Sequence, residues 1–163
     1  MSPPPPTPMD KATALTKAAA LCGASEQCSS DMHTRLIKWG VSDEDASEII
    51  ARLIDNRFID DLRYARAFTH DKLRYNRWGR IKIAYALRQK QLASTTITEA
   101  LQAIDDEWAE EYREALLHTV APHGPEALRN DIAGNPKQRD KTLRHAASHG
   151  FTADEIYEIL RLR

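Results

Sequence analysis

The amino-acid sequence predicts an all-α protein made of three tandem three-helix units in an elongated, curved array. Apolar residues recur at helical spacing almost everywhere after residue 10, as in Ile49, Ile50 and Leu53, and no segment alternates like a strand. Side chains that can cap helices recur at related places along the chain. An ungapped alignment of three segments also superposes their apolar residues. Together these observations favour a helical repeat.

The repeat appears when Gly40, Gln91 and Gly150 are aligned, which gives spacings of 51 and 59 residues. A stretch with several Pro and Gly residues, 122–135, accounts for the longer spacing. The superposed apolar residues are Leu36, Leu87 and Ala146 before this position, and Ala46, Ile97 and Ile156, then Ile50, Leu101 and Leu160, after it.

Each unit is expected to contain three helices, after a proline-rich tail over 1–9 that cannot be helical because proline lacks the amide donor. The units span 10–56, 57–104 and 105–163. The expected helices are 10–22, 28–39 and 43–56, then 60–75, 78–90 and 94–104, then 106–120, 136–149 and 153–162.

Helix starts are marked by side chains that can accept hydrogen bonds from the free amides of the first turn. Ser42-x-x-Asp45 and Thr152-x-x-Glu155 have the pattern of capping boxes, and Asn135-Pro136 that of a cap and first helical position. Two aspartate pairs, at 60–61 and 105–106, each follow an isoleucine. We interpret both pairs as carboxylates at helix N-termini, where the helix dipole stabilises negative charge.

No feature of the sequence indicates catalysis. The chain has no GxxxxGK[ST], GxGxxG or GxSxG motif, so we expect no enzyme activity, catalytic residue or cofactor. The Asp60–Asp61 pair is the usual prompt for acid–base chemistry, but its place at a helix start favours a structural role. His145 and His149 lie one turn apart without a third ligand, so no metal site is expected.

Composition indicates a cytoplasmic protein. Charged residues make up 29% of the chain, and no apolar run approaches the roughly 20 residues of a membrane span. No charged start precedes an apolar stretch, so no signal peptide is expected. The two cysteines, Cys22 and Cys28, are too few for a disulfide framework and are expected to be reduced thiols.

The net charge of −1 conceals a basic middle. Residues 57–91 hold 10 basic and 3 acidic side chains, a charge of +7, whereas residues 1–56 carry −3 and residues 104–163 carry −4. Such asymmetry points to an anionic partner for the middle of the chain.

Four of these basic residues and one histidine form a stripe within an arc of about 80° on the predicted helix 60–75 and just beyond it. The stripe contains no acidic residue, so it is expected to face solvent or a partner, and a solvated charged face is the simpler alternative. Trp78 could stack on a base, although core packing is favoured. The stripe is Arg63, Arg66, His70, Arg74 and Arg77, and it clusters with Arg80, Lys82, Arg88 and Lys90.

The middle of the chain resembles the RecX family of RecA regulators. The resemblance rests on FIDDLRYARAF at 58–68, WGRIKI at 78–83 and LRQK at 87–90, and weaker similarity extends over 10–163. Departures are Gln91 where the family often has glycine, Ala146 where a larger apolar residue is usual, and the long stretch 122–135. The resemblance implies a cytoplasmic modulator that lies in the groove of the RecA–single-stranded DNA filament and restrains its ATPase, strand exchange and co-protease activities.

We therefore expect filament-groove binding by a monomer, with RecA and the single-stranded DNA as partners and the nine basic residues above as contacts. The alternative is a helical nucleic-acid-binding module that acts without RecA, which would lose affinity steeply with salt. A scaffold that uses its acidic ends is a third possibility, and a metal-dependent enzyme is the last.

Overall fold

The computed structural model contains nine α-helices and no strand in the residues it describes, which are 1–4, 7–120, 134 and 136–160. The all-α fold class is confirmed, and each described helix lies within three residues of its predicted bounds. The helices are α1 (Lys11–Ala24), α2 (Ser29–Lys38), α3 (Asp43–Asp55), α4 (Asp61–Asn76), α5 (Arg80–Gln89), α6 (Ser94–Asp106), α7 (Ala109–Val120), α9 (Pro136–Ser148) and α10 (Ala153–Leu160).

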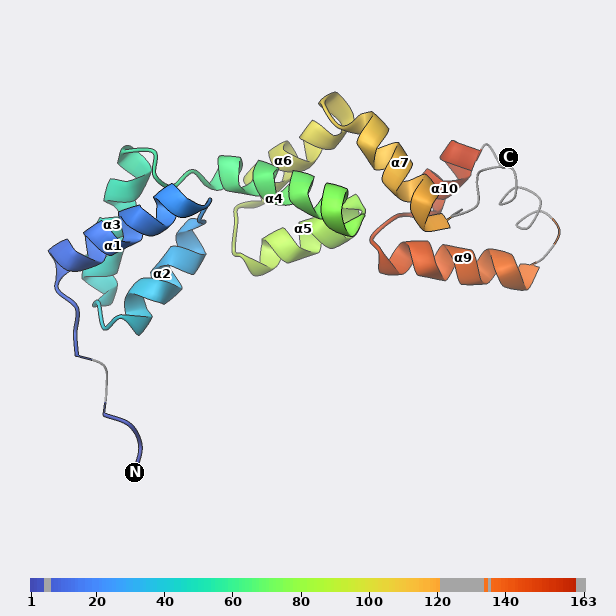
Figure 1. Cartoon of the computed structure of the whole chain (residues 1–163). Helices are drawn as coiled ribbons and strands as arrows, with labels where there is room; N and C mark the ends of the chain where they lie inside the picture. Colours follow the sequence, from blue (N-terminus) through green and yellow to red (C-terminus); the bar gives the residue numbers. More distant parts are fainter. Residues whose placement is uncertain (5–6, 121–133, 135, 161–163) are drawn as a thin grey trace.

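The helices form an elongated array in chain order (Figure 1). Helices α1 to α3 lie at one end, α4 to α6 in the centre, and α7 to α10 at the other end, so the two termini are far apart. At the N-terminal end, the Met9 amide donates to the Trp39 carbonyl at 3.1 Å. The last residue of the predicted tail is therefore attached to the first helices.

The predicted helix starts have a local cause in their capping side chains. Ser42 Oγ accepts from the Asp45 amide at 3.2 Å. Thr152 and Glu155 form a reciprocal box, since Thr152 Oγ1 accepts from the Glu155 amide at 3.1 Å and Glu155 Oε2 from the Thr152 amide at 3.0 Å. These bonds satisfy amides that have no partner within the helix. The predicted cap Asn135 lies outside the described residues.

The second helix of each unit ends at a residue with left-handed backbone, at the three positions aligned in the sequence. The φ angles are +84° at Gly40, +58° at Gln91 and +95° at Gly150. This conformation ends a helix and turns the chain back toward the core. The residue that follows is buried in each unit: Val41, Leu92 and Phe151.

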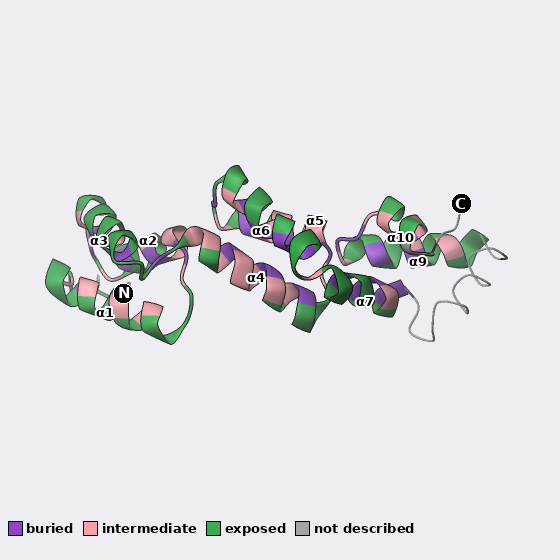
Figure 2. Ribbon diagram, turned by 90° about the horizontal axis from the view of Figure 1, so that it is seen from above, coloured by how far each residue is buried: buried purple, intermediate pink, exposed green. Residues whose placement is uncertain are grey.

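Two hydrophobic clusters form the core (Figure 2). One is confined to α1–α3 and the residues next to them, and the other runs continuously from α4 to α10. Aligned positions have equivalent burial, because Leu36, Leu87 and Ala146 are all 0% exposed. The second column is buried as well, with Ala46, Ile97 and Ile156 at 0 to 5% exposure. The side chain of Leu160, in the third column, lies outside the described set.

The second helices of the three units meet end to end. The Gly79 amide donates to the His149 carbonyl at 2.6 Å and the Ile81 amide to the Gly150 carbonyl at 3.2 Å, so the start of α5 meets the end of α9. A Cβ at Gly79 would overlap the Gly150 carbonyl, so this approach requires glycine. Likewise Ser30 Oγ, in the first turn of α2, donates to the carbonyl of Lys90 at the end of α5.

Candidate functional site

Helix α4 carries the predicted basic stripe on the side away from its buried residues. Asp60 is its N-cap and accepts from the Arg63 amide at 3.0 Å, while Ala65 and Leu73 face the core. The helix ends at Arg77, which has a φ of +53°. The stripe is therefore outside the core, as predicted, and Asp60 has the structural role expected of it.

Arg63 is bound to the first unit. Its Nε donates to Glu26 at 2.7 Å, and its Nη2 lies within hydrogen-bond distance of the carbonyls of Arg57 and Phe58, at 3.2 and 3.3 Å. The hydrogen bond to Glu26 raises the pKa of the Arg63 guanidinium. This side chain thus ties the start of α4 to the segment between α1 and α2 and to the residues that follow α3.

Arg66 and His70 contact the residues just before α7 and its first turn. Arg66 pairs with Glu107 at 2.6 Å, and the His70 ring stacks on Trp108 with centroids 4.2 Å apart and planes at 2°. His70 Nε2 is 3.0 Å from an oxygen of Glu111. Both side chains therefore join the second unit to the third.

The expectation that the stripe lacks acidic partners is wrong for these residues. Carboxylates come from other parts of the chain: Glu26 lies between α1 and α2, and Glu107 and Glu111 lie before and within α7. Arg74 has the loosest pairing, with its Nε 3.9 Å from Glu111. Most of the stripe is thus a set of junctions within the molecule.

Arg80 links α5 to three other helices. Its Nε donates to Glu155 at 2.7 Å and its Nη2 to Asp105 at 3.1 Å, and its guanidinium lies 4.8 Å above the Tyr112 ring. Burial would lower the pKa of Arg80, but its bonds to Asp105 and Tyr112 outweigh that effect and raise it. The prediction that Asp105 and Asp106 begin a helix is wrong: they end α6, and Arg80 compensates the charge of Asp105 there.

Trp78 contacts lysines of its own unit. The Nζ atoms of Lys72 and Lys82 lie 4.8 and 4.7 Å from the ring centroid, and the ring packs against the larger hydrophobic cluster. Lys82 also donates to the carbonyl of Ser148 at 3.3 Å. Core packing with a cation on the ring therefore describes Trp78, as was favoured from the sequence.

Lys90 and Asp61 hold the junction between the first two units. Lys90 Nζ donates to Asp31 at 2.8 Å. Asp61 accepts from the amide and Oγ of Ser29 at 2.9 and 2.6 Å, so it caps α2 from the neighbouring unit. This long-range cap explains the second aspartate of the pair, and it was not predicted because Ser29 is 32 residues away.

Three of the predicted contacts have no ion pair to a described carboxylate: Arg77, Lys82 and Arg88. The rings of His145 and His149 are 4.9 Å apart, and burial lowers the pKa of His149. Within the described part of the chain, no group of three or more His, Cys, Asp or Glu side chains could hold a metal ion. None of the described helices is long and apolar enough to span a membrane.

These features define an all-α tandem-repeat protein whose units are joined by charged and aromatic side chains. Comparison with known proteins gives the same class. The model of the second three-helix domain of RecX matches residues 60–101. The chain is thus similar to the RecX family of regulatory proteins in its second unit.

Relatives match along most of the chain. Regulatory protein RecX of Prosthecochloris aestuarii is 28% identical over 152 residues, 93% of each chain. That of Lactobacillus johnsonii is 30% identical over 121 residues, which cover 74% of this chain and only 42% of the relative. The crystal structure of RecX from Lactobacillus salivarius superposes with a TM-score of 0.76 at 19% identity, over 93% of this chain and 95% of that one, and shows the same fold.

Proposed function

We propose that this protein regulates the RecA recombinase by binding in the groove of the RecA–single-stranded DNA filament as a cytoplasmic monomer. The observation that carries the proposal is the similarity to regulatory RecX proteins over 93% of both chains. The fold suits the task, because an elongated array can contact more than one filament subunit. The surplus charge of +7 over residues 57–91 suits a surface rich in phosphates and carboxylates.

The nine basic residues predicted from the sequence remain candidate contacts, but they differ in the internal ion pairs that binding a partner would break. Arg77 and Arg88 come first, because neither has an ion pair with a described carboxylate that binding would break. Arg80 comes last, because its bonds to Asp105 and Glu155 are internal and its side chain is 33% exposed. Lys82 has no ion pair either, but it donates to the Ser148 carbonyl and lies over the Trp78 ring. The others would exchange an internal carboxylate for one of the partner: Arg63, Arg66, His70, Arg74 and Lys90.

The proposal predicts inhibition of the ATP hydrolysis that the cognate RecA performs on single-stranded DNA. The measurement is the steady-state hydrolysis rate with increasing amounts of this protein, beside a titration with bare single-stranded DNA. Binding to the filament with a lower hydrolysis rate is the expected result. An unchanged rate with no filament binding would sink the proposal, and tight binding to bare DNA alone would favour a nucleic-acid-binding module acting without RecA.

A further inference from the structure

The second helices of the three units form one continuous edge of the molecule. In Figure 1, α9, α5 and α2 follow one another along the lower edge, joined by the end-to-end contacts described above. Helices α2, α5 and α9 have 10, 10 and 13 residues, which make about 50 Å of helix at 1.5 Å per residue. The edge is therefore long enough to contact an extended ligand along its length.

The outer faces of these helices carry equivalent positions. Thr34, Tyr85 and Arg144 are aligned in the repeat, lie about 160° round the helix from the buried column, and are all exposed. We call the exposed residues of this face the outer ridge. It comprises Thr34, Ile37 and Lys38 on α2, Ile81, Tyr85 and Arg88 on α5, and Lys141, Arg144 and Ala147 on α9.

The outer ridge carries cations without carboxylate partners. No described carboxylate lies within ion-pair distance of Lys38, Arg88, Lys141 or Arg144. Arg144 instead donates from Nε to the backbone carbonyl of Asp140 at 3.4 Å. Unlike Arg63, Arg66, His70 and Arg74 of the α4 stripe, these four would lose no internal ion pair on binding an anion.

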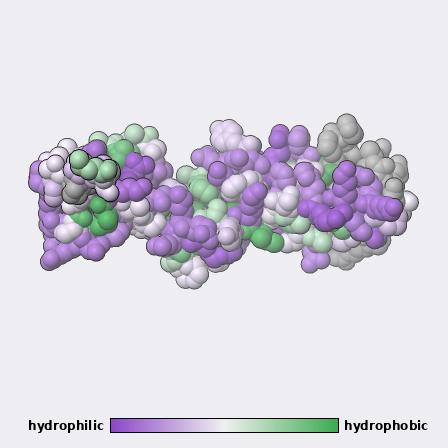
Figure 3. Space-filling view, turned by 90° about the horizontal axis from the view of Figure 1, so that it is seen from below, coloured by the Kyte–Doolittle hydropathy of each residue, from purple (hydrophilic) through white to green (hydrophobic). Residues whose placement is uncertain are grey.

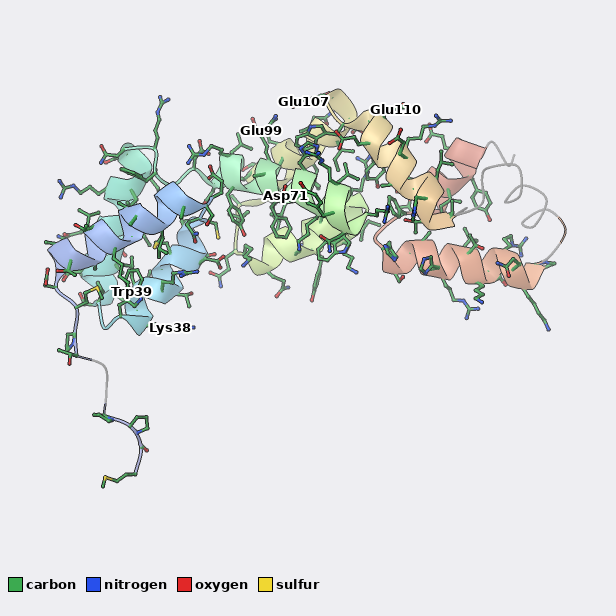
Figure 4. The ribbon with its side chains drawn as sticks, in the orientation of Figure 1. Lys38, Trp39, Asp71, Glu99, Glu107 and Glu110 are labelled. Atoms are coloured by element: carbon green, nitrogen blue, oxygen red, sulfur yellow. The ribbon has the colours of Figure 1, made fainter. Side chains whose placement is uncertain are left out.

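Apolar and aromatic side chains alternate with these cations. Three large hydrophobic residues on the ridge are exposed: Ile37 at 41%, Ile81 at 52% and Tyr85 at 59%. Figure 3 views this edge from below and shows a mostly hydrophilic face with apolar patches over the first and middle units. In Figure 4, Lys38 lies at the lower end of the first unit, away from the other helices.

We propose that the outer ridge binds the phosphate backbone of a single-stranded nucleic acid, with a base stacked on Tyr85. This assignment rests on the proposed function, and it places the DNA contacts on α2, α5 and α9 instead of α4. A single-stranded nucleic acid fits because its charge recurs along its length and because every base has a face that can stack on an exposed ring. An acidic protein surface would use the cations but would not require the aromatic ring.

The test compares the full chain with a triple variant of the ridge, Lys38→Glu, Arg88→Glu and Arg144→Glu. The matched control, Lys17→Glu, Arg52→Glu and Arg113→Glu, makes the same change in net charge at exposed residues of α1, α3 and α7. Circular dichroism establishes that all three proteins are folded. Binding is measured by fluorescence anisotropy with a labelled oligothymidylate, bare and coated with RecA, at several salt concentrations.

We expect the ridge variant to lose at least tenfold in affinity for both forms of the oligonucleotide, and the control to lose far less. The slope of log K against log salt should fall by about 2, since each contact to single-stranded DNA contributes roughly 0.7. Tyr85→Ala should weaken binding about tenfold, whereas Tyr75→Ala, at another exposed tyrosine, should not.

Two results would overturn the assignment. Equal losses in the ridge variant and the control would show that only net charge matters. Loss of binding to the coated oligonucleotide alone, with an unchanged salt slope, would assign the ridge to a protein surface. A third result separates the two proposals. If wild type binds only the bare oligonucleotide and the ridge variant does not bind it, the assignment of the outer ridge is supported and the proposed function is contradicted.

Discussion

Gln91 occupies a backbone position that the other two units give to glycine. Its φ is +58°, against +84° at Gly40 and +95° at Gly150. A residue with a Cβ is disfavoured in this conformation by roughly 1 to 2 kcal/mol, because the Cβ crowds the following carbonyl. The second unit therefore ends its middle helix at an energetic cost that the other two avoid.

Replacing Gln91 by glycine should raise the free energy of unfolding by about 0.5 to 1 kcal/mol, since relief of crowding exceeds the entropy that glycine adds to the unfolded chain. The control is Gln89→Gly, which lies at the end of α5 with helical backbone and should lower the same quantity by a similar amount. Urea unfolding followed by circular dichroism measures both. A loss of stability in both variants would contradict the argument.

At the residue scale, the sequence predicted helix ends, which depend on neighbouring residues, and missed ion pairs between residues far apart in the chain. The alignment of Gly40, Gln91 and Gly150 placed the end of the second helix in each unit correctly, because a helix end depends on a few neighbouring residues. The ion pairs of Arg63 and Arg66 were missed, because their carboxylates are 37 and 41 residues away. Periodicity shows which face of a helix is polar, but not which helix faces it.

Among the elements, α5, α7 and α10 share one partly buried polar network. Tyr112 Oη accepts from the Arg80 amide at 3.1 Å, so the first helix of the third unit caps the middle helix of the second. Tyr112 also donates to Glu155, with its oxygen 3.0 Å away. Burial raises the pKa of Tyr112 to about 12. Deprotonation would remove its hydrogen bond to Glu155 and place two negative charges side by side.

This network predicts a loss of stability in alkali. The folded protein holds the Tyr112 proton more tightly than the unfolded chain, whose tyrosine pKa is about 10. The protonated Tyr112 side chain therefore makes its full contribution to the free energy of unfolding below pH 10. This contribution, up to about 2 kcal/mol, is lost as the pH rises toward 12. Urea unfolding between pH 8 and 11.5 should show a steeper loss in wild type than in Tyr112→Phe.

The phenylalanine variant should be less stable than wild type at pH 8, because the Arg80 amide and Glu155 lose a partner. Its free energy of unfolding should depend less on pH than that of wild type. The difference in slope between the two proteins isolates the effect of Tyr112 from that of all other groups, which the two proteins share. Parallel curves for the two proteins would show that Tyr112 does not govern the alkaline loss.

Helix positions were predicted well because caps and apolar spacing belong to single segments, as Ser42 and Thr152 illustrate. Asp105 and Asp106 misled the prediction, because a carboxylate pair after isoleucine begins α4 but ends α6. A carboxylate is unfavourable at a helix C-terminus, because the helix dipole is negative there. At the end of α6, the charge of Asp105 is compensated by Arg80, which is 25 residues away in the sequence.

Across the whole molecule, the distribution of the core separates the first unit from the other two. The cluster that contains Leu36 and Leu53 is formed by the first unit and Ile59 just after it, whereas the cluster that contains Leu87 and Ile156 spans the second and third units. The first junction relies mainly on polar contacts, with Cys28 as the buried residue that the first unit adds to the larger cluster. Units in a repeat array couple only through such interfaces.

We therefore predict two regions of different cooperativity. Leu53→Ala and Leu87→Ala each remove a side chain that is at most 1% exposed and should each cost about 2 to 5 kcal/mol locally. Hydrogen exchange measured by mass spectrometry should speed up in α1–α3 alone for Leu53→Ala, because the second cluster keeps its packing. For Leu87→Ala it should speed up from α4 through α10, because those helices share one core. Uniform acceleration along the chain in either variant would mean that the junction at Cys28 transmits the loss and that the molecule unfolds as one body.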